Sequence, residues 1–201
     1  MIQFATCKNK IASDINPYSI AFLQKIQKEG CEWLPKNNKE FTEEDYNYMK
    51  THKDEFDNAT LGHVGFNLSY GGKWFNSPRR DRTNKRDYIA EGYREANKQA
   101  EKIKDVKFVC CSYNELDIPE KSVIYCDIPY FSTGKYEAVK EEFDYDKFYK
   151  WCKYMTNKGH KVYVSEYNMP SDFKCVWEKE HKVQIKVDSN SLEVTERLFT
   201  L

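Results

Sequence analysis

The stretch VIYCDIPY, residues 123–130, is the part of the chain that most constrains its fold. Its first half is apolar and rich in β-branched and aromatic residues, which predicts a strand over about 122–126. Asp127, Pro129 and Tyr130 follow at the carboxyl end of that strand, where open α/β sheets bind their ligands. An acid can accept a hydrogen bond from an amine, and an aromatic ring can stack on a flat base. These residues predict the lip of a binding pocket; a plain strand-to-loop turn, in which Asp and Pro are common, is the alternative.

Strands and helices alternate on either side of this stretch. Apolar periodicity and capping residues predict helices over about 16–30, 42–53, 86–103 and 146–157, strands over 10–14, 106–110, 162–165 and 182–187, and a last hairpin partner over 192–201. The glycine-rich and aromatic segment 61–75 predicts an irregular loop or a hairpin. Alternation of this kind predicts an α/β fold, with a mainly parallel sheet and helices on both faces.

Length and composition narrow the class of protein. A chain of 201 residues predicts one domain with room for an inserted subdomain. Its formal net charge is zero, so a basic nucleic-acid surface would have to be local. The seven cysteines form no C-x-x-C pair and the four histidines are dispersed, which predicts reduced thiols, no metal site and a cytoplasmic protein. No apolar run approaches the roughly 18 residues of a membrane span.

Two further strand ends carry candidate binding residues. Asp14 ends the strand 10–14 and precedes a helix, where an acid can bind both hydroxyls of a nucleoside ribose. The alternative is that Asp14 caps the helix. Together with Asp127 on another strand of the same predicted sheet, Asp14 predicts a crevice for a nucleoside cofactor. The segment 108–116 predicts a third edge of this crevice or an ordinary strand exit, and 164–170 a loop that closes over a base or a plain turn.

One segment of the chain is basic and interleaved with aromatic residues. Between residues 73 and 86 only Asp81 opposes the positive charges. Basic side chains among aromatic rings suit a phosphate backbone and its bases, so the segment predicts a nucleic-acid contact rather than a solvated loop. The candidate DNA-binding residues are Lys73, Arg79, Arg80, Arg82, Lys85 and Arg86.

Five motifs in order along the chain resemble those of one enzyme family. They are ASDIN at 12–16, GF at 65–66 with GKWF at 72–75, FVCCSY at 108–113, VIYCDIPY at 123–130 and VSEYN at 164–168. This ordered set is similar to the Dam-type (D12 class) DNA N6-adenine methyltransferases, especially phage-encoded ones. The resemblance implies a Rossmann-like S-adenosylmethionine-dependent methyltransferase fold, with a core of residues 1–30 and 105–201 and a target-recognition insert over 31–104.

The resemblance also implies roles for particular residues. Asp127 and the Pro129 carbonyl would hydrogen-bond the N6 amine of the target adenine, and Tyr130 would stack on the adenine after it leaves the duplex. Asp14 would hold the ribose of S-adenosylmethionine. The full set of implied cofactor-binding residues is Asp14, Phe108, Ser112, Tyr113 and Asp127. The implied partner is double-stranded DNA.

The chain departs from the family pattern in two places. Ile128 stands where the family has the first proline of its D-P-P-Y motif. The glycine-rich F-x-G-x-G motif, expected about twenty residues before Asp14, has no counterpart in this sequence. We therefore expect either a complementing amino-terminal chain, a homodimer, or a catalytically impaired relative that binds DNA or protein.

Overall fold

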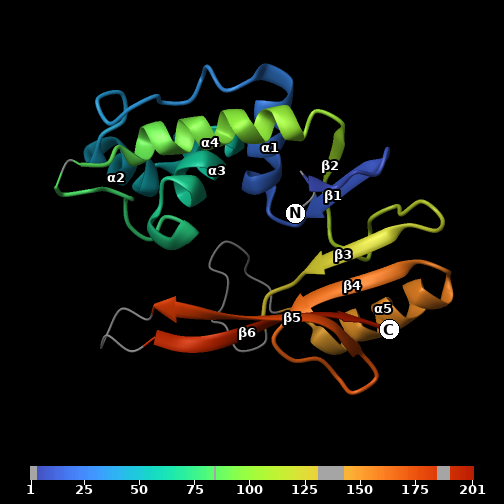
Figure 1. Ribbon diagram of the computed structural model, residues 1–201. Coiled ribbons are helices and arrows are strands. Elements are labelled where there is room, and N and C mark those ends of the chain that lie inside the picture. Colours follow the sequence, from blue (N-terminus) through green and yellow to red (C-terminus); the bar gives the residue numbers. More distant parts are fainter. Residues whose placement is uncertain (1–3, 84, 131–142, 185–190) are drawn as a thin grey trace. The chain divides into compact units, whose positions relative to one another are not determined.

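The computed structural model describes residues 4–83, 85–130, 143–184 and 191–201. The chain divides into two compact units, Met1–Leu116 and Asp117–Leu201 (Figure 1). Each unit contains its own sheet, and each is described separately below.

The sheet of the first unit is a parallel pair of strands. β1 (Lys10–Asp14) pairs with β2 (Val106–Cys110), and the register sets Asp14 opposite Cys110. The carboxyl ends of the two strands are therefore level. The helix α1 (Pro17–Glu29) follows β1 as predicted, because Asn16 caps its first turn and a proline occupies its first position. Gly30, with φ 75°, ends the helix.

The remaining helices of the first unit lie within the predicted insert, residues 31–104. They are α2 (Glu43–Thr51), η2 (Lys53–Glu55), α3 (Asn58–Gly62), the π-helical turn η3 (His63–Asn67), η4 (Tyr70–Gly72) and α4 (Tyr88–Lys102). The capping box predicted for α2 is present, with Thr42 and Asp45 bonding each other's backbone N–H. One hydrophobic core joins Phe22 and Ile26 of α1 to Leu34 and Ala96 of the insert. The insert and the strand pair thus share buried side chains.

The prediction of a loop or hairpin over 61–75 was wrong for its first half, which is helical. A Cβ at Gly62 would lie 2.2 Å from the backbone oxygen of Tyr18, and one at Gly65 would lie 2.4 Å from the Trp74 ring. These glycines permit helix packing at close range and do not mark turns. The extended structure in this segment is the single bridge between Ser69 and Pro78.

The second unit contains a mixed sheet with the order β3–β4–β6–β5 (Figure 1). β3 (Val123–Asp127) runs parallel to β4 (Lys161–Glu166), and α5 (Tyr145–Asn157) connects them. β5 (Lys174–Gln184) and β6 (Ser191–Thr200) form an antiparallel hairpin that joins β4 through β6. β5 starts at Lys174 rather than at the predicted 182, because an exposed edge strand needs no apolar alternation.

The prediction of one mainly parallel sheet needs correction. Among the described residues the strands form two sheets, so Asp14 and Asp127 end strands of different sheets. Two strand pairs are parallel, β1–β2 and β3–β4, and two are antiparallel. The fold is therefore mixed α/β, as expected of the class, with parallel pairing confined to the strands that carry the candidate residues.

Candidate functional site

The acid–aromatic lip, Asp127–Tyr130, lies at the carboxyl end of β3 as predicted. Ile128 is buried, so it anchors the segment and leaves the Asp127 side chain exposed on its other side. The Pro129 carbonyl accepts a hydrogen bond from the hydroxyl of Tyr145 at 2.8 Å. The Tyr130 hydroxyl contacts the Ser165 hydroxyl at 3.1 Å. The lip is thus held from α5 and from β4.

The pKa values of three side chains at or beside the lip are raised above their ordinary values. Desolvation by neighbouring protein, and in addition the charge of Glu196, raise the pKa of the Asp127 carboxyl. Desolvation likewise raises the pKa of the Tyr130 hydroxyl, so this group stays protonated at neutral pH. Burial raises the pKa of the Cys126 thiol to about 12. The adjacent thiol is therefore no nucleophile, whereas a carboxylate of raised pKa is a good hydrogen-bond acceptor.

The candidate cofactor residues lie at the level ends of β1 and β2. Oδ1 of Asp14 accepts a hydrogen bond from the backbone N–H of Asn16 at 2.8 Å, and the residue remains exposed. Asn16, not Asp14, caps α1, so the alternative role for Asp14 is wrong. The backbone N–H of Ser112 donates to Glu115 at 3.2 Å, which orders the turn after β2. Desolvation raises the pKa of Asp14.

Phe108 differs from the other candidate cofactor residues. Its side chain is buried in the core that α1 forms with the strand pair. Gln24 of α1 donates to its carbonyl oxygen at 3.1 Å. Phe108 thereby fixes β2 against α1 and so supports the turn that presents Ser112 and Tyr113.

The basic segment is more neutralised than the sequence indicated. Glu91 of α4 forms ion pairs with Arg86 at 2.9 Å and with Arg79 at 3.8 Å. Arg80 is half-buried and donates to the Phe41 carbonyl at 2.8 Å. Asp81 accepts hydrogen bonds from the backbone N–H groups of this loop and folds it back on itself. Asp81 is the one acid within residues 73–86, but Glu91 from α4 also opposes the charge of this segment. Within residues 73–86, the exposed basic side chains that form no ion pair with described residues are those of Lys73, Arg82 and Lys85.

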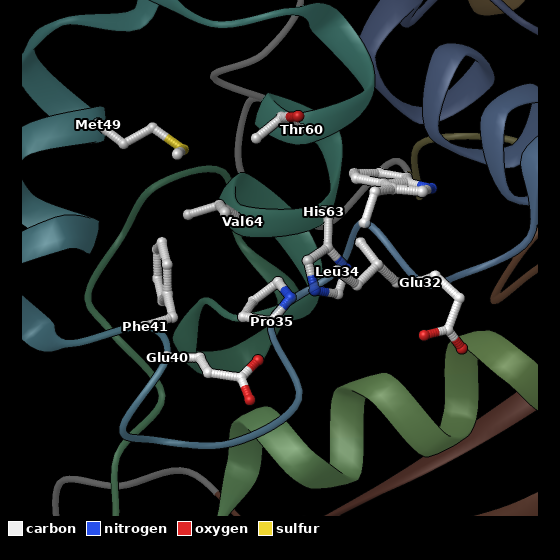
Figure 2. A pocket seen from close by; sticks show the side chains of 10 residues that line it. Glu32, Leu34, Pro35, Glu40, Phe41, Met49, Thr60, His63 and Val64 are labelled. Carbon is white, nitrogen blue, oxygen red and sulfur yellow. The ribbon is translucent and has the colours of Figure 1, made fainter.

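A cavity that the sequence did not predict lies among the helices of the first unit. Its volume is about 370 Å³, and Figure 2 shows its lining side chains, which include His63, Phe41 and Glu40. His63 is buried, and its Nε2 atom has no hydrogen-bond partner among the described residues. Desolvation lowers the pKa of His63 to about 4, so the ring is neutral at neutral pH. No signal in the sequence distinguishes this histidine from the other three.

The strand-end geometry and the ordered motifs together point to one family. Residues 1–190 match the D12 class N6 adenine-specific DNA methyltransferase family. The chain belongs to this family. Membership supports methylation of adenine in DNA as the activity and DNA as the substrate. A search of curated proteins gave no match.

Two negative findings concern the described part of the chain. It contains no group of three or more side chains suited to hold a metal ion. No helix within it is long and apolar enough to cross a membrane.

Proposed function

We propose that this D12-family protein is a site-specific DNA adenine-N6 methyltransferase that acts on an adenine rotated out of the duplex. The observation that carries the proposal is the lip itself. An exposed carboxylate, a carbonyl and a partly exposed aromatic ring follow one another at the end of β3. These are the groups that an exocyclic amine on a flat base requires, two acceptors and a stacking surface.

The chemistry demands acceptors because the N6 amine is a poor nucleophile. Its lone pair is delocalised into the purine ring, and positive charge develops on nitrogen when it attacks. Asp127 and the Pro129 carbonyl would hold the two N–H groups and stabilise that charge. The Pro129 carbonyl already accepts the Tyr145 hydroxyl. A carbonyl has a second lone pair for the amine, and the Tyr145 bond fixes its direction.

The first unit offers residues that fit S-adenosylmethionine. When bound, this cofactor supplies a methyl group on a positively charged sulfur. The Asp14 carboxylate is exposed at a strand end, and two carboxylate oxygens have acceptor capacity for ribose hydroxyls beyond the bond that Oδ1 accepts from Asn16. Ser112 and Tyr113, in the turn after the neighbouring strand, would flank the adenine. The donor set is that of a nucleoside site and not of a metal.

Contacts with DNA are proposed for the basic segment. Lys73, Arg82 and Lys85 are exposed and form no ion pair with described residues, so they are the stronger candidates for phosphate contacts. Arg79 and Arg86 share Glu91 and stack over the Tyr88 ring. The Glu91 carboxylate partly offsets the positive charge that these two residues present to a phosphate. Arg80 would act mainly by holding the loop to Phe41.

A second candidate function is one half of a split methyltransferase. It is favoured by the position of β3 at one end of its sheet, where among the described residues of its own unit it pairs with β4 alone. Val123, at the start of this strand, is 69% exposed. Parallel sheets are normally covered and their edges protected. A complementing chain or a second copy that adds a strand there would protect this edge.

The test is transfer of a tritiated methyl group from S-adenosylmethionine to duplex DNA that lacks N6-methyladenine. The protein and its Asp117→Ala variant, an exposed acid in the same unit, should label the DNA. Asp127→Ala should not. Absence of labelling by the unaltered protein at saturating cofactor would overturn autonomous activity. Labelling that survives Asp127→Ala would overturn the role of the lip.

A further inference from the structure

We propose that Ser165 and Tyr167 are positioning residues that fix the angle of the Tyr130 ring before a base arrives. The inference rests on the proposed function, because it assigns to Tyr130 the stacking role. Both residues come from the end of β4 and the turn after it, 35 or more positions along the chain from Tyr130. The sequence marked their segment, 164–170, as a loop over a base or a plain turn, but gave neither residue a role of its own.

The register of the sheet brings Ser165 to the lip. β3 and β4 are parallel, with Asp127 opposite Ser165 and Tyr125 opposite Tyr163. Since alternate residues of a strand share a face, Ser165 lies on the face that carries Asp127 and Tyr125. Its hydroxyl contacts the Tyr130 hydroxyl at 3.1 Å and is also a hydrogen-bond partner of Tyr125. A serine hydroxyl has one donor and two acceptor sites, so it can serve both tyrosines at once.

Tyr167 restrains the same ring from a second direction. The ring centroids of Tyr130 and Tyr167 are 4.6 Å apart, and the planes meet at 82°. An edge-to-face pair of this kind prefers one relative orientation. It occupies at most one face of Tyr130, and Tyr130 remains partly exposed. The contact therefore sets the tilt of the ring and is compatible with stacking on a base.

The hairpin of β5 and β6 anchors Tyr167 in turn. Nη1 of Arg197 donates to the Tyr167 carbonyl at 2.7 Å, and Nε of Arg197 donates to Glu178 at 3.1 Å. Arg197 stands opposite Glu166 of β4 and Glu178 of β5, so it links three strands. The Tyr130 ring is thereby connected, through Tyr167 and Arg197, to the far strand of the sheet.

Pre-orientation of this kind should affect the methylation step more than binding. If methylation requires one orientation of the Tyr130 ring, loss of the Ser165 contact lets the ring adopt other orientations. The fraction of molecules in which the ring can stack on the base then falls. One neutral hydrogen bond changes an equilibrium by up to about tenfold. We therefore expect Ser165→Ala to lower kcat by up to about tenfold and to leave KM for S-adenosylmethionine unchanged.

The experiment is a double-mutant cycle with Ser165→Ala, Tyr130→Phe and the double variant. Tyr130→Phe keeps the ring and removes only the hydroxyl. If Ser165 acts through that hydroxyl, the two single effects on kcat are alike and the double variant is no slower than either. Ser171→Ala, an exposed serine in the turn before β5, should behave like the unaltered protein. Additive effects, or a Ser165→Ala variant with unchanged kcat, would overturn the proposal.

A matched pair of substitutions tests the second contact. Tyr167→Phe retains the ring and should keep kcat within about twofold, whereas Tyr167→Leu removes the edge-to-face partner and should lower kcat by about three- to tenfold. Equal activity of the Phe and Leu variants would overturn the role of the Tyr167 ring.

A readout that needs no activity separates this proposal from the proposed function. In protein labelled with ¹³C at the tyrosine hydroxyl-bearing carbon, Tyr130→Phe identifies the Tyr130 signal. That signal should move in Ser165→Ala and stay in place in Ser171→Ala. If the protein transfers no methyl group but the signal moves, the proposed function fails and the contact stands. A signal that does not move contradicts the contact whatever the activity.

Discussion

The ends of β1 and β3 each present an aspartate of raised pKa, yet their surroundings differ. Asp14 is held by the backbone of its own turn, through the N–H of Asn16. Asp127 is followed by residues held from other elements, by Tyr145 of α5 and Ser165 of β4. A locally held acid suits recognition of a constant ligand such as a ribose. An acid beside an oriented ring suits a reaction whose geometry must be controlled. The comparison predicts that Asp14 serves binding and Asp127 serves chemistry.

The largest expected effect is that of Asp127→Ala on the rate of methyl transfer. Removal of one acceptor aimed at a developing charge typically costs 10²- to 10³-fold in kcat. Asp127 is also one of the residues implied to contact the cofactor, so calorimetric affinity for S-adenosylmethionine should fall too, but far less than the rate. If Asp127→Ala lowered cofactor affinity by the same factor as the rate, the assignment of Asp127 to the methylation step and of Asp14 to cofactor binding would be contradicted.

Asp14→Ala should show the opposite pattern. Loss of charge-assisted hydrogen bonds to hydroxyls weakens binding by about ten- to a hundredfold. The variant should therefore need more S-adenosylmethionine but approach the normal kcat at saturation. Asp14→Asn, which keeps one acceptor oxygen, should lie between. A fall in kcat that excess cofactor does not restore would contradict a pure binding role.

The pH dependence of activity sharpens the comparison further. Asp127 must be ionised to accept both the amine and its developing charge, and desolvation raises its pKa. As pH falls through that raised pKa, kcat should fall by about tenfold per pH unit, from a higher pH than an ordinary aspartate near 3.9 would give. Protonation of Asp14 should instead raise KM for the cofactor. Initial rates measured from neutral pH down past the range of an ordinary aspartate separate the two. A kcat that begins to fall only where an ordinary aspartate titrates, or below, would argue against Asp127.

The smallest effects are expected in the basic segment. Lys85→Ala should weaken DNA binding a few-fold and reduce the slope of log K against log salt by about one, as the loss of one phosphate contact does. Arg80→Ala should leave that slope unchanged and lower the free energy of unfolding by about 1–2 kcal/mol, because Arg80 donates to Phe41 inside the first unit. Urea unfolding and salt-dependent binding distinguish them. Equal salt slopes for the two variants would contradict this assignment.

Local signals in the sequence were sufficient for much of the fold. The cap at Asn16, the capping box at Thr42 and the glycine at 30 act within a few residues, so α1 and α2 could be located from the sequence. The prediction of a loop over 61–75 failed at Gly62 and Gly65 because these glycines allow close packing, Gly62 against Tyr18, 44 residues earlier, and Gly65 against Trp74 of the same segment. The length of β5 was missed for a related reason, since its pairing with β6 is visible only in the sheet.

The candidate site divides in the same way. Asp14 and the lip could be found because each is a strand end followed by a distinctive polar or aromatic residue. The sequence marked the segment 164–170 as well, but the contact of Ser165 with Tyr130 could not be predicted, because only the register of β3 with β4 brings the two together. The pairing of Glu91 with Arg79 depends on how the loop folds back, so the charge of the basic segment was overestimated.

The most direct test of the central claim is nucleoside mass spectrometry of duplex DNA incubated with the protein and S-adenosylmethionine. If the lip holds the exocyclic amine of adenine, N6-methyladenine should be the one modified nucleoside that appears, and it should be absent with Asp127→Ala. Methylation of cytosine instead, or N6-methyladenine formed at an equal rate by Asp127→Ala, would contradict the account.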